Sequence, residues 1–191
     1  MRRSHAATGY MLRAMEANPD RGAGRPHVVV RHRKERLSKC SLTGLETRPD
    51  LAFYRYPDAL PPAEALVGGA CLDLDAPVLG PEDAGRPLIV IDGTWRLAAR
   101  MYRATGLDRA EAVVRRRLPD DVATAYPRCQ TLCPDPARGL ASVEALYAAY
   151  LATGRDPRGL LDHYHWAEAF LARNAAVFAR LLEAGSASAA R

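Results

Sequence analysis

The segment Leu88–Arg100, LIVIDGTWRLAAR, predicts how this chain folds. Its first four residues, 88–91, form a short continuous apolar run, which is typical of a strand buried on both faces of a parallel sheet. Asp92 and Gly93 end that run. From Thr94, which stands in the position of an N-cap, the apolar residues recur at helical spacing. The segment therefore predicts a strand, a tight turn and a helix, the repeating unit of an α/β fold.

Three further segments upstream have the composition of strands. His27–Arg31 is a β-branched run, Leu51–Tyr56 alternates apolar and polar residues, and Ala70–Leu74 is a weaker candidate. Together with residues 88–91 they predict an α/β protein.

Helices are expected in the second half of the chain, at about 108–117, from Ser142 to Gly154, and at about 157–183. Arginines crowd the C-terminal end of the first, a glycine ends the second, and apolar residues recur every 3.6 positions in the third. The proline-rich segment 118–139 is expected to be a long loop, and loops of this length in compact domains are usually functional.

Composition predicts a soluble globular protein, since the 191 residues are 48% hydrophobic and 26% charged. The expected divisions are a flexible lead-in at 1–26, an N-terminal lobe at 27–84, a larger region at 85–185 and a disordered Ala/Ser tail at 186–191. No apolar run approaches the ~20 residues needed to span a bilayer, and the N-terminus lacks the apolar stretch of a secretory signal. We therefore expect a cytoplasmic protein with no membrane contact.

The charge of the chain favours an RNA partner. The net charge is +5, and Lys34 and Lys39 are the two lysines among 27 basic residues, so the rest are arginines. A guanidinium binds phosphate through two parallel hydrogen bonds, and neutralisation of phosphate dominates nucleic-acid affinity. An arginine-rich composition that reflects genome bias is an equally good explanation of the count alone.

Asp92 is the first candidate for chemistry. In open α/β sheets ligands gather at the carboxyl ends of strands, and Asp92 stands at such an end, while Gly93 allows close approach to the backbone. Trp95, in the first turn of the helix, can stack on a base. The alternatives are that Asp92 caps the turn and that Trp95 belongs to the core.

The second candidate is the loop that leads into the helix at Ser142. A helix N-terminus presents free N–H groups and can hold a carboxylate or phosphate, and Arg128 and Arg138 would add positive charge. An ordinary solvated loop is the alternative.

No metal site is expected. The cysteines, Cys40, Cys71, Cys129 and Cys133, include one closely spaced pair without a second Cys/His pair beside it, so free thiols are predicted rather than zinc. His163 and His165 fall within the predicted last helix, where they would point to different sides and cannot chelate one metal together.

The chain also resembles a known family. Similar motifs occur in the family's order, as SKCSL at 38–42, VLGPED at 78–83, IDGTW at 91–95, CPDPARGLASVEALYAAYLATG at 133–154 and YHWAEAFLARN at 164–174. They resemble the DTW superfamily of aminocarboxypropyltransferases, and more closely its ribosome-maturation branch, whose late Trp-x3-Phe-x3-Asn helix matches Trp166, Phe170 and Asn174. The resemblance covers roughly residues 27–175. This chain departs from the family at Leu42-Thr43, where the family has Lys-Lys, and at Cys133, where it has Asn.

The resemblance implies a SPOUT-like, mostly parallel α/β fold with a small N-terminal α/β lobe and a C-terminal trefoil knot, within residues 85–185, that encloses S-adenosylmethionine (SAM). It further implies that SAM is bound mainly by backbone groups of three loops. These expected contacts are Leu72, Asp73, Ile91, Gly93, Thr94, Trp95, Gly139, Leu140, Ala141 and Ser142.

The implied activity is transfer of the 3-amino-3-carboxypropyl group of SAM to N3 of a uridine or pseudouridine in rRNA or tRNA, by a monomer. Asp92 would act as general base or would orient N3. Arginines and one lysine would grip RNA phosphates, namely Arg31, Arg33, Arg36, Lys39, Arg128 and Arg138. Two alternatives remain open, a SPOUT RNA methyltransferase and a non-catalytic RNA-binding factor for ribosome assembly.

Overall fold

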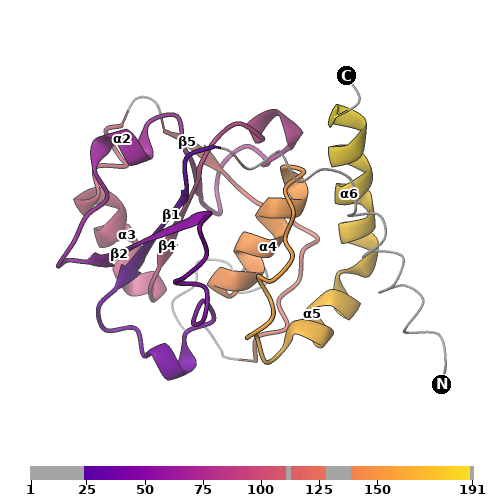
Figure 1. The fold of residues 1–191 in the computed structure, drawn as a ribbon, viewed down its shortest axis with the longest axis horizontal. Helices are drawn as coiled ribbons and strands as arrows, with labels where there is room; N and C mark the ends of the chain where they lie inside the picture. Colours follow the sequence, from indigo (N-terminus) through magenta and orange to yellow (C-terminus); the bar gives the residue numbers. More distant parts are fainter. Residues whose placement is uncertain (1–23, 111–112, 128–138, 190–191) are drawn as a thin grey trace.

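The computed structural model describes residues 24–110, 113–127 and 139–189, so most of the predicted lead-in lies outside the described residues. Its strands form one sheet in the order β2-β1-β4-β3-β5 (Figure 1). The strands are β1 (His27–His32), β2 (Leu51–Tyr56), β3 (Ala70–Leu72), β4 (Leu88–Asp92) and β5 (Val114–Arg116). Every neighbouring pair is parallel. The predicted α/β class and its upstream strands are confirmed.

The connections leave β1 and β4 in opposite directions. β1 is followed along the chain by β2 at one edge of the sheet, whereas β4 leads to β5 at the other edge. In the register between these two central strands Arg31 lies opposite Asp92. Such a switch point, at the carboxyl ends of the strands, is where ligands bind in open α/β sheets.

Helices cover both faces of the sheet (Figure 1). The helices are α2 (Ala63–Leu66), α3 (Trp95–Ala104), α4 (Ser142–Ala152), α5 (Ala167–Arg173) and α6 (Ala175–Ala189), with short 3-10 turns η1 (Leu37–Lys39) and η2 (Pro81–Asp83). Because strand side chains alternate, Val29 and Val90 pack with the α4–α6 layer, whereas Val30 and Ile89 pack with α2 and α3. The result is a three-layer α/β/α arrangement.

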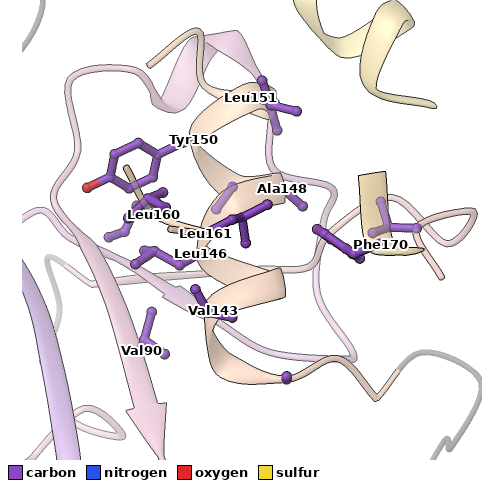
Figure 2. Packing of buried hydrophobic residues seen from close by; sticks show 14 of the residues in the cluster. Val90, Val143, Leu146, Ala148, Tyr150, Leu151, Leu160, Leu161 and Phe170 are labelled. Atoms are coloured by element: carbon purple, nitrogen blue, oxygen red, sulfur yellow. The ribbon is translucent and has the colours of Figure 1, made fainter. Parts of the chain in front are cut away.

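Helix α4 is buried on nearly all sides. Figure 2 shows Val143 and Leu146 on the side of Val90 in β4, with Phe170 on the other side of the helix. Helix α6 packs against α4 as well. A helix that is apolar all round is typically buried in this way, and it is held firmly where it reaches the carboxyl ends of the strands.

The prediction of a helix at 108–117 was wrong, since Val114–Arg116 is strand β5, parallel to β3. Its arginines find partners on neighbouring segments: Arg115 pairs with Asp73 and Arg116 with Asp83, so the arginine run is compatible with a strand.

The single long helix expected at 157–183 is two helices preceded by turns. Gly159, with φ of +79°, lies among those turns, and the helical path breaks at Asn174, whose side chain bonds elsewhere. His163 and His165 therefore lie in turns rather than in a helix. Helix α6 continues to Ala189, past the predicted start of a disordered tail at residue 186, which agrees with the high helix propensity of alanine.

The expected boundary between the N-terminal lobe (27–84) and the larger region (85–185) falls between β3 and β4, two neighbouring strands of the same sheet. Among the described residues no helix combines the length and apolar character that crossing a bilayer requires.

Candidate functional site

A cavity of about 850 Å³ opens at the carboxyl ends of β3, β4 and β5, beside the N-terminus of α4. Its volume is in the range of sites for small molecules and cofactors. The expected SAM contacts that line it are Leu72, Asp73, Ile91, Gly93, Thr94, Trp95, Leu140, Ala141 and Ser142. Gly139 is buried next to it without lining it. The structure thus brings three distant loops together around one space.

Asp92 lies on the wall of this cavity and is 5% exposed. Its Oδ2 accepts hydrogen bonds from Nε of Arg31, at 2.9 Å, and from the thiol of Cys40, at 3.4 Å. Its Oδ1 accepts the hydroxyl of Ser142 at 2.7 Å. One carboxylate therefore joins β1, β4, the loop at residue 40 and the start of α4.

Arg31 is buried and contacts Asp92 without lining the cavity. Its guanidinium also pairs with Glu46 at 2.6 Å and lies 4.7 Å from the ring centre of Phe53. Burial by itself would lower the pKa of Arg31, but the hydrogen bond to Glu46 and the negative charge of Asp92 raise it. The prediction that Arg31 grips RNA phosphate is therefore corrected: this side chain is inside the protein and holds the Asp92 carboxylate.

The other basic residues predicted to bind RNA fall into two groups. Arg33, Arg36 and Lys39 are exposed, and Lys39 also lines the cavity. Arg128 and Arg138 lie outside the described residues. The role of the exposed three in RNA binding stays a prediction.

The cysteines in the described residues are free thiols. Burial and the nearby Asp92 charge raise the pKa of Cys40 to about 11, so at neutral pH it is a thiol that donates to Asp92. Burial raises the pKa of Cys71 to about 12. Cys129 and Cys133 lie outside the part of the chain that the structure describes, and within that part no cluster of three or more His, Cys, Asp or Glu side chains could hold a metal.

The start of α4 forms one wall of the cavity. Ser142 is the first residue of the helix, and the N–H of Val143 donates to the hydroxyl of Ser41 at 3.3 Å. Ala141 occupies the N-cap and has no side-chain oxygen, but its N–H donates to the carboxylate of Glu144 at 2.9 Å. Half of a capping box is thus present.

Glu144 also ties α4 to the loop at 122–126. Its carboxylate is fully buried and accepts bonds from the hydroxyl of Thr124 (2.6 Å), the N–H of Ala125 (2.8 Å) and the hydroxyl of Tyr164 (2.9 Å). The loop supplies Val122 and Tyr126 to the cavity wall. Sequence reasoning included Glu144 in a motif but gave it no role.

Asn174 and Trp166 hold the same loop from the other side. The amide of Asn174 accepts from the N–H of Ala123 (2.7 Å) and donates to its carbonyl (2.8 Å). The ring of Trp166 meets that of Tyr126 edge-on, with centroids 4.9 Å apart. The Trp-x3-Phe-x3-Asn motif therefore supports the cavity wall indirectly, while its Phe170 belongs to the core.

Several cavity residues were missed by sequence reasoning, including Arg96, Tyr102, Arg103, Arg115, Arg117 and Tyr126. Arg115 donates to Asp73 at 2.8 Å. Burial would raise the pKa of Asp73, but the hydrogen bond from Arg115 lowers it, so Asp73 is ionised. The pair of valines at 113–114 is the signal that could have located Arg115 and Arg117, since it favours a strand that ends at the same edge of the sheet; Arg96 and Arg103 lie on α3 instead.

Comparison with known proteins gives one structural similarity. No protein-family model and no curated protein sequence matches the chain. Among solved structures, its fold is similar to that of the SAM-dependent rRNA:acp-transferase Tsr3 from Vulcanisaeta distributa, with a TM-score of 0.59 and 22% sequence identity. The similarity covers 83% of this chain and 84% of that one. At this level of identity the similarity establishes a shared fold.

Proposed function

We propose that this chain is a SAM-dependent RNA aminocarboxypropyltransferase that modifies ribosomal RNA. The observation that carries the proposal is the cavity at the carboxyl ends of β3–β5, with the Asp92 carboxylate in its wall. The fold is shared with an enzyme described as an SAM-dependent rRNA:acp-transferase, which supports both the donor and the class of acceptor.

The residues present fit SAM as the donor substrate. The cavity is large enough for a nucleoside with an amino-acid arm, and its wall combines apolar side chains, such as Leu72 and Val122, with residues of 91–95 and 140–142, whose backbone groups would hold SAM as the family resemblance implies. The N-terminus of α4 carries partial positive charge and suits the carboxylate of the methionine arm. We assign the loops after β3, after β4 and before α4 to the trefoil knot that the family resemblance implies.

The reaction joins N3 of a uridine or pseudouridine to Cγ of the methionine arm and breaks the bond between Cγ and sulfur, which releases methylthioadenosine. The N3 proton must leave as this happens. The Ser142 hydroxyl donates to Asp92, so its lone pairs can accept N3–H while Asp92 takes the serine proton. A positioned base of this kind contributes ~10²–10⁴-fold to a rate.

Arg31 and Cys40 act on Asp92 rather than on the substrate. Both donate to Oδ2, which fixes the carboxylate so that Oδ1 faces Ser142. Transfer of Cγ instead of the methyl group then depends on how SAM is oriented, and orientation is the part of catalysis that a preformed cavity supplies.

The test uses purified protein, small-subunit rRNA that lacks the modification, and SAM labelled either in the carboxyl group or in the methyl group. We expect carboxyl label in the RNA, and an aminocarboxypropyl nucleoside by mass spectrometry. Methyl label in RNA would indicate a methyltransferase instead. RNA binding with neither label incorporated would favour the non-catalytic factor.

Asp92→Asn separates catalysis from binding in the same assay. We expect loss of product while SAM binding, measured by calorimetry, is retained. Full activity in this variant would remove Asp92 from the mechanism.

A further inference from the structure

The outer face of α3 carries a row of arginines. Arg96, Arg100 and Arg103 are spaced by four and three residues, which places them on one side of the helix, and all three are exposed. On the opposite side Met101 is fully buried. The helix contains no acidic residue, and like charges at these spacings destabilise a helix. A negatively charged partner would remove that repulsion.

A second, smaller hollow of about 220 Å³ lies between this row and the carboxyl end of β1. Four of the eight residues that line it are arginine or lysine; the lining residues are His32, Arg33, Lys34, Tyr56, Pro57, Arg96, Leu97 and Arg100. No carboxylate is among them.

The positive charge of this hollow is largely uncompensated. Arg33 pairs with Asp58 at 3.4 Å, whereas Lys34, Arg96 and Arg100 form no ion pair with any carboxylate of the described residues. Burial lowers the pKa of His32, and the charges of Lys34, Arg33 and Arg100 lower it further. The His32 imidazole therefore lies in a positively charged environment.

Arg96 lines both hollows. Arg103 lines the larger cavity and belongs to the same row on α3. Basic side chains on α3 and at the end of β1 therefore line both the smaller hollow and the cavity that contains Asp92. We refer to Lys34, Arg96, Arg100 and Arg103 as the α3 basic surface.

We propose that the α3 basic surface binds the sugar–phosphate backbone of single-stranded RNA, next to the nucleotide whose base enters the larger cavity. The inference rests on the proposed function, because a base that reacts at N3 must be unpaired and its backbone must continue away from the cavity. Guanidinium groups suit phosphate geometry, and a charged groove that follows the backbone is typical of single-strand binding.

The test measures binding of a fluorescein-labelled 12-residue oligouridine by anisotropy at several KCl concentrations. The variant is Lys34→Gln combined with Arg100→Gln, since neither residue lines the larger cavity. The control is Arg158→Gln combined with Arg180→Gln, which removes the same net charge from two exposed arginines that are paired with aspartates. Helix α6, which carries Arg180, lies on the other face of the sheet from α3 (Figure 1).

Each single-strand phosphate contact contributes about 0.7 to the slope of log K against log salt. Loss of two contacts should therefore reduce the slope by about 1.4 and weaken binding roughly 25-fold at 0.1 M salt. The control should keep the wild-type slope, and calorimetry should give an unchanged SAM affinity for the Lys34/Arg100 variant. Arg103→Gln tests the other end of the surface, with a slope change of about 0.7.

An unchanged slope in the Lys34/Arg100 and Arg103 variants, or equal losses in the variant and the control, would overturn the assignment. So would binding to phosphatidylserine vesicles without measurable RNA affinity. The proposed function is judged separately: if the wild-type protein transfers no aminocarboxypropyl group but the slopes change as expected, the enzyme proposal fails and the RNA surface stands. If the wild-type protein transfers the group but the salt slopes of the variants are unchanged, the enzyme proposal stands and the RNA surface fails.

Discussion

Replacing Glu144 by alanine should be among the most destabilising single changes in this chain. The buried carboxylate accepts four hydrogen bonds, from Ala141, Thr124, Ala125 and Tyr164. Its removal would leave all four donors without this partner; the donors on Ala141 and Tyr164 are buried, those on Thr124 and Ala125 are half-buried, and each unpaired buried donor costs about 1–3 kcal/mol.

The losses are not additive, because the four donors share one acceptor and the loop can relax. We therefore expect about 4 kcal/mol, near the upper end of single-residue effects. For a chain of this size that corresponds to a fall in Tm of about 8–16 °C. Glu144→Gln keeps the shape but turns an NH₂ donor toward other donors, so about 2 kcal/mol is expected.

The assay is urea unfolding followed by circular dichroism, with SAM affinity measured in parallel. SAM affinity should fall with Glu144→Ala, because the loop at 122–126 forms part of the cavity wall. Glu183→Ala, an exposed glutamate on α6, is the matched control and should behave as wild type. If the Glu144 variant lost no more stability than the Glu183 variant, the carboxylate would not be holding the loop.

Three further changes test the surroundings of the site. Arg31→Met leaves the buried Asp92 carboxylate without its counter-ion, and we expect a loss of about 3 kcal/mol in urea unfolding together with loss of transfer; unchanged stability would contradict the pairing. Burial, with the charge of Arg155, lowers the pKa of His27 from 6.5 to about 4. The unfolded chain therefore binds more protons below pH 6.5, so stability present above that pH should fall by roughly 3 kcal/mol as the pH drops to 4, and His27→Gln should remove that pH dependence. Ala141→Ser supplies the missing N-cap oxygen of α4 and should raise stability by about 1 kcal/mol, read as a higher urea midpoint; no change would mean that the hydroxyl does not reach the helix N–H groups.

The parts of the fold that could be predicted have local signals. The apolar run at 88–91, the turn at Asp92 and the helix after Thr94 follow one another in the sequence, and the structure has β4 and α3 there. Strand β5 has three residues, two of them arginines, and it is specified by pairing with β3 and by distant carboxylates. Periodicity cannot detect such a strand.

Only part of the candidate site could likewise be predicted from local sequence signals. Asp92 and its flanking loops could be found because position at a strand end and the family resemblance indicate the same residues. Arg31 was misread as an RNA contact because the register that sets it opposite Asp92 joins residues far apart in the chain. The support of the loop at 122–126 by Asn174 likewise depends on tertiary contacts that a linear pattern does not contain.

The burial of α4 has a consequence for the entropy of ligand binding. This helix is packed between the sheet and α6, so Ser142 is held on a scaffold that is rigid before any donor arrives (Figure 2). Preorganisation of this kind reduces the conformational freedom that must be lost on association. Ordering on binding should therefore occur outside α4, whereas amide hydrogen exchange in the middle of α4 should be slow and nearly the same with and without SAM.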